Sequence, residues 1–124
     1  MRKLNILLVE DDELSRKVTT FYLKRYGHEV ENAINGLEAV SSFKANKYDL
    51  ILMDIQMPVM DGLQAAKEIR RLEMDYPEKG HTSIIAITTN PDKVAIFKAG
   101  MDGYTQKPFS FEGLNTLLIN NNLA

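Results

Sequence analysis

Short runs of consecutive apolar residues alternate along the chain with longer segments in which apolar residues recur every three or four positions. The runs have the length of β-strands, and their lack of polar residues is typical of strands that are buried on both faces of a sheet. The second expected strand alternates only weakly and should be more exposed, and the fifth is brief. We predict strands at residues 5–10, 29–33, 50–53, 84–87 and 103–106.

The segments between the expected strands have the apolar spacing of helices. Gly27 is placed to end the first helix, and Asn35 can cap the second, whose apolar residues we expect to face the core. Pro91 is suited to the first turn of the fourth helix, which Gly100 should close, and residues 74–82 are expected to form an exposed loop. The apolar positions of the first, second, third and fifth helices are Leu14, Val18, Phe21 and Tyr22; Leu37, Val40 and Phe43; Leu63, Ala66, Ile69 and Leu72; and Leu114, Leu117 and Leu118.

Five strands that alternate with five helices predict an α/β fold with a parallel sheet covered by helices on both faces. Right-handed crossovers then make a doubly wound five-stranded sheet the economical arrangement. In such sheets, ligands bind beyond the carboxyl ends of the strands, where the strand order reverses. The carboxyl ends of the predicted strands are therefore the place to look for functional residues.

Composition bounds the class of protein. Apolar residues make up 44% and charged residues 26% of the 124 residues, which allows one packed domain over residues 1–124 and leaves no room for a second. The longest apolar runs are far too short to span a bilayer, and no signal-peptide pattern follows Met1. The absence of cysteine and the net charge of −2 argue against disulfides, thiolate metal sites and nucleic-acid binding. We expect a cytoplasmic domain without membrane or nucleic-acid partners.

Polar residues with chemical potential follow the predicted strands. Glu10 and Asp11 come after the first strand, Asp54 after the third, Thr88 after the fourth and Lys107 after the fifth. If the first and third strands are central, the three carboxylates meet in one small pocket. Two carboxylates about 5 Å apart repel by roughly 3 kcal/mol at an effective dielectric of about 20, so three of them need a proton or a cation. Oxygen ligands favour Mg²⁺, and Lys107 would supply a second positive charge.

This arrangement of acidic residues has a chemical use. A carboxylate is a competent nucleophile toward phosphorus and gives an aspartyl phosphate. Phosphoryl transfer requires mainly positioning and charge neutralisation, which Mg²⁺, Lys107 and the Thr88 hydroxyl could share. The acceptor would be Asp54, on the most buried strand. Each residue taken alone also has an ordinary structural interpretation, such as a helix cap for Asp11 or a turn residue for Asp54, so the hypothesis depends on their joint placement.

The chain resembles, over essentially its whole length, the receiver domain of two-component response regulators. The resemblance implies a flavodoxin-like (βα)5 fold with strand order 2-1-3-4-5, and a phosphorelay switch rather than an enzyme with turnover. It also implies that a phosphohistidine on a sensor histidine kinase or a histidine phosphotransfer domain donates the phosphoryl group. The matching segments are residues 6–12 (ILLVEDD), 54–62 (DIQMPVMDG), 86–88 (AIT) and 104–109 (YTQKPF).

Carried over by position, the resemblance makes Asp54 the phosphoacceptor. Asp11 and Asp54 would bind Mg²⁺ directly, together with the backbone carbonyl of Gln56, and Glu10 would act through water. Thr88 would be the switch hydroxyl that turns toward the phosphoryl oxygens. Five further residues complete the implied site and its frame. Lys107 would hold a phosphoryl oxygen, and the rotamer of Tyr104 would follow Thr88. Pro108, after a cis peptide bond, and Pro58 and Gly62 of the second segment would be structural residues.

Two features depart from the commonest receiver pattern. The residue after the switch position is usually very small, yet here it is Thr89, which would narrow access to Asp54. The polar segment 74–82 is longer than in many stand-alone receivers and, together with residues 48–62, resembles receivers at the ends of hybrid sensor kinases. The chain could therefore be a stand-alone receiver or a fragment of a hybrid kinase. We expect phosphorylation to act on a downstream protein through the 91–99 helix, the fifth strand and the last helix.

Three other classes of protein share parts of this pattern. A phosphatase of the haloacid-dehalogenase type also uses an aspartate nucleophile and Mg²⁺. Its motif requires a second aspartate two residues after the first, where this chain has Gln56. A flavodoxin-like protein would need a first loop that tolerates the FMN phosphate, whereas the acidic residues 10–13 would repel it. A pseudo-receiver would keep the fold and never accept a phosphoryl group.

Overall fold

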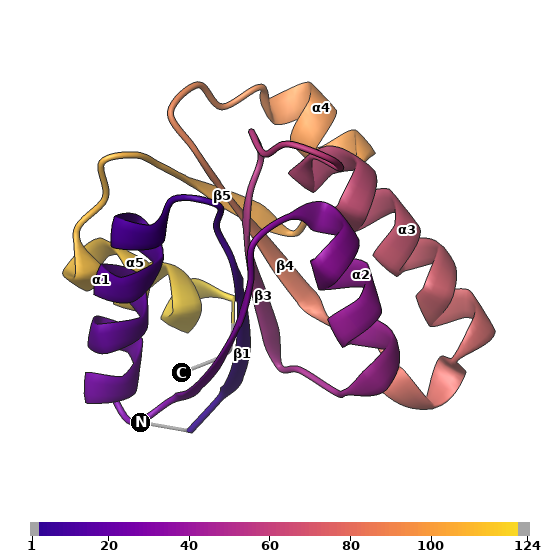
Figure 1. Cartoon of the computed structure of the whole chain (residues 1–124), viewed down its shortest axis with the longest axis horizontal. Coiled ribbons are helices and arrows are strands. Elements are labelled where there is room, and N and C mark those ends of the chain that lie inside the picture. The colour runs from indigo at the N-terminus through magenta and orange to yellow at the C-terminus, as the bar shows by residue number, and fades with distance from the viewer. Residues whose placement is uncertain (1–2, 122–124) are drawn as a thin grey trace.

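The computed structural model describes residues 3–121 as one five-stranded sheet flanked by helices (Figure 1). All strands are parallel, in the order β2-β1-β3-β4-β5. The predicted doubly wound sheet and its strand order are confirmed. In chain order the elements are β1 (Asn5–Val9), α1 (Glu13–Arg25), β2 (Glu29–Ala33), α2 (Gly36–Ala45), β3 (Leu50–Asp54), α3 (Gly62–Asp75), the 3-10 turn η1 (Pro77–Lys79), β4 (Ser83–Thr88), α4 (Lys93–Lys98), β5 (Gly103–Gln106) and α5 (Phe111–Asn120).

The helices divide between the two faces of the sheet. Helices α1 and α5 cover one face, and α2, α3 and α4 cover the other (Figure 1). Successive residues of a strand point to opposite faces, so Leu7 packs under α2 and α3 while Leu8 packs under α1 and α5. Every residue of β3 is buried, which explains why its sequence shows no alternation. The apolar strands thus contribute side chains to two hydrophobic cores, one on each face of the sheet.

A polar side chain caps the amino terminus of each of the five α-helices. In every case the cap accepts a hydrogen bond from the backbone N–H three residues further on, which satisfies a donor that has no partner inside the helix. Gly27 and Gly100, which follow α1 and α4, both have φ of +93°, a conformation that favours glycine. The caps are Asp12, Asn35, Asp61, Asp92 and Ser110.

The second helix buries Val40 and Phe43, as expected, but not Leu37. Leu37 was predicted to point inward, but it is 52% exposed, whereas Gly36 and Ala39 are buried together with Val40. A Cβ atom at Gly36 would lie 2.5 Å from the backbone carbonyl oxygen of Met60, so only a glycine lets this neighbouring turn come so close. The inner stripe is therefore made partly of small residues, which an apolar pattern does not reveal.

Two other expectations about element boundaries were wrong. Pro91 lies outside α4, because the side chain of Asp92 accepts a hydrogen bond from the Ala95 N–H and thereby starts the helix at Lys93. The segment 74–82 is not simply a loop, since α3 continues to Asp75 and the turn η1 follows. The ion pairs of Arg71 with both Glu68 and Asp75 support this last turn of α3.

Helix α1 is where its spacing predicted, yet most of its apolar residues are exposed. Leu14 is 72% and Phe21 is 57% exposed, while Thr19 and Leu23 are buried against the sheet. An apolar stripe at helical spacing is thus present on α1 without belonging to the core. None of the helices formed by residues 3–121 combines the length and apolar character needed to cross a membrane.

Candidate functional site

Three carboxylates meet at the carboxyl edge of the sheet. β1 and β3 are neighbours in register, with Val9 opposite Met53, so the residues that follow, Glu10 and Asp54, also lie side by side. Oxygen atoms of Glu10, Asp11 and Asp54 all lie within 4.8 Å of one another. Glu10 and Asp54 are buried, whereas Asp11 is exposed. The structure therefore brings together the acidic residues that the sequence pointed to and leaves one side of the cluster open to solvent.

The surroundings of Glu10 disfavour the charged form of its carboxyl group. Its Oε1 accepts a hydrogen bond from the Nζ of Lys107 at 3.2 Å, but its buried Oε2 has no hydrogen-bond partner among residues 3–121. Burial and, next, the adjacent Asp54 together raise the pKa of Glu10 to about 8, against the smaller lowering by Lys107. At neutral pH, this carboxyl group holds a proton unless a cation takes the proton's place.

Lys107 is the cation that the chain itself provides. Its Nζ lies 3.2 Å from Glu10 Oε1 and 3.4 Å from Asp54 Oδ2. Burial alone would lower the pKa of Lys107, but the carboxylates of Asp54 and Glu10 raise it above its ordinary value. The backbone N–H of Lys107 donates to the carbonyl of Thr88 at 2.8 Å, so the backbone from which this side chain extends is held against β4. One ammonium group neutralises only part of the charge of three carboxylates.

The donor set fits a hard divalent cation. Carboxylate oxygens are the ligands that Mg²⁺ prefers, and Mg²⁺ keeps several waters, which the exposed side at Asp11 accommodates. The unpartnered Oε2 of Glu10 is also suited to a water held by the cation. Gln56 follows Asp54 by two residues in an exposed turn, and the ligand role of its carbonyl stays a prediction.

The turn between β3 and α3 is tightly constrained. A Cβ atom at Gly62 would lie 2.2 Å from the carbonyl oxygen of Asp54, so a larger residue would push α3 away from the acidic cluster. The Met60 N–H donates to the Pro58 carbonyl at 2.9 Å, which closes a three-residue turn around Val59. Val59 has φ of +72°, which is unusual for a β-branched residue. Close packing on Gly62 holds this turn next to Asp54.

Thr88 and Tyr104 lie beside the cluster on β4 and β5. The Thr88 side chain is buried, and its hydroxyl accepts a hydrogen bond from the Asn90 N–H at 3.2 Å, within its own turn. The half-buried ring of Tyr104 contacts Phe97 edge-to-face, with centroids 6.4 Å apart, and lies under the ammonium of Lys93. Their roles in switching stay predictions. The Lys107–Pro108 peptide bond is cis.

A groove beside the acidic cluster was not predicted from the sequence. It has a volume of about 510 Å³ and lies between α1 and the segment that leads into α5. Glu10, Thr89 and Lys107 line one end, and apolar residues of α1 such as Leu14 line the other. The apolar residues of α1 were the feature of the sequence that could have indicated this groove. Thr89 therefore stands at the rim of the site, as its position in the sequence implied.

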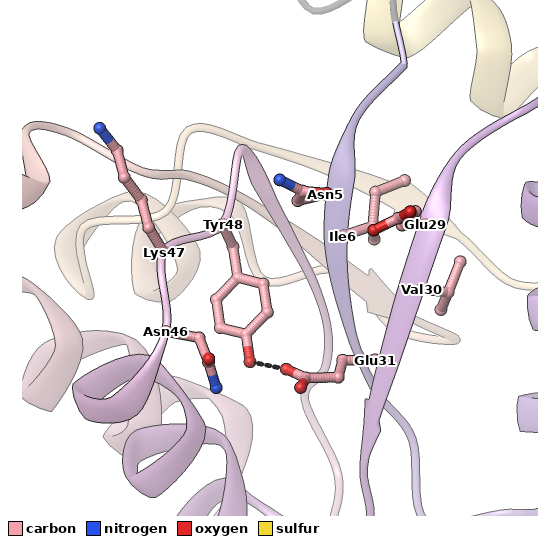
Figure 2. Close-up of a pocket in the computed structure, with 8 residues that line it drawn as sticks. All are labelled: Asn5, Ile6, Glu29, Val30, Glu31, Asn46, Lys47 and Tyr48. Atoms are coloured by element: carbon pink, nitrogen blue, oxygen red, sulfur yellow. Dashed lines mark hydrogen bonds between the residues drawn. The ribbon is translucent and has the colours of Figure 1, made fainter.

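A second pocket, of about 290 Å³, lies at the opposite end of the strands (Figure 2). The hydroxyl of Tyr48 donates to the carboxylate of Glu31 across this pocket, with Asn46 beside them. Burial and, next, the Glu31 carboxylate together raise the pKa of Tyr48 to about 12. Because this pocket opens near the amino ends of β1 and β2, it does not belong to the carboxylate cluster.

An acidic pocket with a lysine, at the carboxyl edge of a flavodoxin-like sheet, defines a class of phosphoryl-accepting signalling domains. The chain belongs to the response regulator receiver domain family, whose sequence profile matches residues 6–119. This membership decides against the phosphatase and flavodoxin alternatives.

Relatives and solved structures agree with this assignment. The chain is 38% identical over 117 residues to the aerobic respiration control sensor protein ArcB of Escherichia coli, covering 93% of this chain and 15% of that protein. It is 41% identical over 122 residues to the peroxide stress-activated histidine kinase mak1 of Schizosaccharomyces pombe, covering 92% of this chain and 7% of that protein. The chain thus spans only a small part of these relatives.

Among solved structures, the receiver domain of sensor histidine kinase PA1611 from Pseudomonas aeruginosa is 36% identical, with a TM-score of 0.85 and coverage of 96% of this chain and 97% of that one. That structure is described as having a magnesium ion coordinated in its active site cleft. The Vibrio cholerae chemotaxis protein CheY4 is 30% identical, with a TM-score of 0.86 and coverage of 96% and 98%. The chain is thus a receiver domain of two-component signalling, and such domains are phosphoacceptor switches.

Proposed function

We propose that Asp54 accepts a phosphoryl group from a phosphohistidine and that the modified domain changes its binding to a partner protein. The observation that carries the proposal is the convergence of Glu10, Asp11 and Asp54 within 4.8 Å, with Lys107 in contact with two of them. A carboxylate oxygen of Asp54 attacks phosphorus, a P–O bond forms, and the P–N bond to the donor imidazole breaks. The imidazole takes up a proton as it leaves.

The residues around Asp54 supply positioning and charge. Lys107 neutralises the oxygens of the incoming phosphoryl group as a point donor. Mg²⁺ would be held by Asp11, Asp54 and the Gln56 carbonyl, with Glu10 acting through water, and when bound it supplies charge neutralisation for phosphoryl transfer. The buried position of Asp54 excludes bulk water, which slows hydrolysis of the aspartyl phosphate. Beyond this slow loss of phosphate, no turnover is expected.

The state change follows from the added charge. A phosphoryl group adds about −1.5 to −2 charges at Asp54, and the Thr88 hydroxyl then gains an acceptor that exists only in the modified domain. Tyr104 would follow Thr88, and α4, β5 and α5 would present the altered surface to a downstream protein. The donor would be a sensor histidine kinase or a histidine phosphotransfer protein. A structure at 31% identity pairs such a protein, Ypd1 of Saccharomyces cerevisiae, with the receiver domain of Ssk1, which supports this choice. The lack of cysteine agrees with a cytoplasmic location.

The test is mass spectrometry of the intact chain after treatment with acetyl phosphate and Mg²⁺. The unaltered protein should gain one phosphoryl group, and Asp54→Asn should gain none. Asp12→Asn is a matched control, because Asp12 is an exposed neighbouring acid that caps α1 and asparagine can cap equally well. Uptake of one phosphoryl group by Asp54→Asn would contradict the assignment, and no uptake by any variant would identify a pseudo-receiver.

A further inference from the structure

The loop that follows β4 is attached to the end of β5 by a side chain. Thr88 and Gln106 are register partners at the end of the two strands, and the Lys107 N–H donates to the Thr88 carbonyl at 2.8 Å. One residue further on, the side-chain Nε2 of Gln106 donates to the carbonyl of Thr89 at 3.2 Å. Gln106 thus extends the ladder between β4 and β5 by one carbonyl, into the loop that leads to α4.

The same loop holds the hydroxyl of Thr88. This hydroxyl accepts a hydrogen bond from the Asn90 N–H at 3.2 Å, a local bond of the kind that threonine makes with the residue two positions on. In the proposed switch, the hydroxyl must turn toward a phosphoryl oxygen on Asp54. It then gives up the Asn90 N–H, and the loop must rearrange. A bond that fixes the Thr89 carbonyl opposes this rearrangement.

Resting on the proposed function, we infer that Gln106 is a positioning residue that holds the loop after Thr88 in its unphosphorylated arrangement. Removing the donor of Gln106 should therefore favour the state in which Thr88 contacts the phosphoryl group. The restraint is a glutamine side chain that donates to a loop carbonyl from the adjacent strand.

The place of Gln106 in the fold supports a local effect. It lies directly before Lys107, which contacts Glu10 and Asp54, and two residues after Tyr104, on the same face of β5. Its side chain is exposed, so its replacement removes little packing. The bond is between exposed groups and is worth little to global stability. Its effect should therefore appear in the switching equilibrium rather than in folding.

The experiment compares the binding of Mg²⁺ with the binding of beryllofluoride, an analogue of the phosphoryl group, to the unaltered chain and to Gln106→Met. Methionine keeps the length of the side chain and removes the donor. We expect beryllofluoride in saturating Mg²⁺ to bind about two- to fivefold more tightly to the variant, the factor that corresponds to one modest hydrogen bond. The affinity for Mg²⁺ alone should not change, because none of its expected ligands contacts Gln106.

Two further measurements isolate the mechanism. The amide proton of Asn90 should exchange faster in Gln106→Met, since the loop that carries it loses a restraint. Gln64→Met, at an exposed glutamine in the first turn of α3, is the matched control and should alter neither binding nor exchange. In a Thr88→Ala background, Gln106→Met should no longer affect beryllofluoride binding, because the hydroxyl that it restrains is gone.

The outcomes separate this inference from the function on which it rests. Unchanged or weaker beryllofluoride binding by Gln106→Met, with Thr88→Ala weakening it, overturns the role of Gln106 alone. If Gln106→Met still changes the affinity for beryllofluoride in the Thr88→Ala background, the role of Gln106 is also overturned. If Thr88→Ala leaves the affinity unchanged, or the unaltered chain binds no beryllofluoride at all, the proposed switch itself fails and the inference fails with it.

Discussion

At the amino ends of β4 and β5, the guanidinium of Arg70 is surrounded by acceptors, whereas at the carboxyl ends of β1 and β3 two of three clustered carboxylates share the ammonium of Lys107. Arg70 donates to the carbonyls of Gly100 and Thr82 at 2.8 and 2.7 Å. The two edges belong to the same sheet and are built from the same types of charged residue.

The acidic partners of Arg70 are themselves satisfied. Glu73 pairs with Arg70 at 2.8 Å and accepts a hydrogen bond from the Thr82 N–H. Asp102 pairs with Arg70 at 2.8 Å, accepts from the Ile84 N–H and lies 2.8 Å from His81. The carboxylates at this edge accept hydrogen bonds from Arg70 and from backbone N–H groups, and they hold α3 to the ends of two strands.

The carboxyl edge differs because one of its buried carboxylate oxygens lacks a hydrogen-bond partner within residues 3–121. The buried Oε2 of Glu10 has no hydrogen-bond partner in the described part of the chain, and the pKa of Glu10 is raised to about 8. Carboxylates that are fully hydrogen-bonded within the chain stabilise the fold, whereas the unpartnered oxygen of Glu10 is available to a ligand. Comparing how charges are compensated thus separates the structural edge of this sheet from the functional edge. The following predictions test that difference.

Replacing Arg70 should have the largest effect on stability. Arg70→Ala leaves Glu73 and Asp102, whose side chains are 10% and 27% exposed, without their cation. Removing one partner of a fully buried ion pair costs about 3–5 kcal/mol, and this partly buried network should lose less than that but more than an exposed pair. Urea unfolding measures the loss. The next residue is a matched control: Arg71 is 58% exposed, and Arg71→Ala should cost less than about 1 kcal/mol. Equal losses would show that the Arg70 network is not a structural centre.

Adding Mg²⁺ should stabilise the fold through the carboxyl edge. At a concentration about a hundred times its dissociation constant, Mg²⁺ should raise the free energy of unfolding by about 2.7 kcal/mol. The same concentration should have a much smaller effect on Asp11→Asn, which removes an expected ligand. The neighbouring variant Asp12→Asn should respond like the parent. An equal response of Asp11→Asn would place the bound ion elsewhere.

Raising the pH without Mg²⁺ should weaken the fold at the same edge. The pKa of Glu10 is about 8 in the folded chain against an ordinary value of 4.5, so between these values the folded state holds a proton that the unfolded state has lost. This contribution to stability is complete below about pH 4.5 and is lost as the pH rises through about 8, at up to about 1.4 kcal/mol per pH unit. Urea unfolding between pH 6 and 9 in a chelator measures it.

The control for this pH effect is Glu10→Gln, which cannot titrate and should flatten the profile. Saturating Mg²⁺ should also oppose the fall in the parent, because a cation binds the deprotonated carboxylates. A profile that is identical in the parent and in Glu10→Gln would show that another group titrates.

Acid should weaken the amino edge by a smaller amount. The buried His28 accepts a hydrogen bond from the Leu4 N–H at its Nδ1, at 3.1 Å, and burial lowers its pKa. Below the ordinary pKa of about 6.5, the unfolded state binds a proton that the folded state resists, so stability falls with the pH. The expected loss is less than about 1 kcal/mol between pH 6.5 and 5.5.

The measurement is the difference in urea midpoint between the parent and His28→Asn over this range. Asparagine can offer an acceptor near the position of Nδ1 and does not titrate, so the difference removes the opposite contribution of Glu10. A parent that loses no more stability than His28→Asn would show that His28 does not resist protonation.

The sequence by itself determined the order of the helices and strands and which residues form the acidic site. Unbroken apolar runs such as residues 50–53, alternating with helical segments, are typical of a parallel sheet covered on both faces, and parallel strands bring Glu10, Asp11 and Asp54 to one edge. The strand order followed from resemblance, because periodicity along the chain contains no information about which strands are neighbours.

Only the tertiary structure decided how charges and side chains find partners. The inner face of α2 depends on the approach of Met60 to Gly36, and the Arg70 network joins residues 30 and 32 positions apart. Gln106 reaches Thr89 because β5 lies in register beside β4. Apolar periodicity reports which residues avoid water, whereas a hydrogen bond or an ion pair depends on distances between segments that only the folded chain sets. The compensation of charge, which separates the two edges of the sheet, is therefore a property of the tertiary structure.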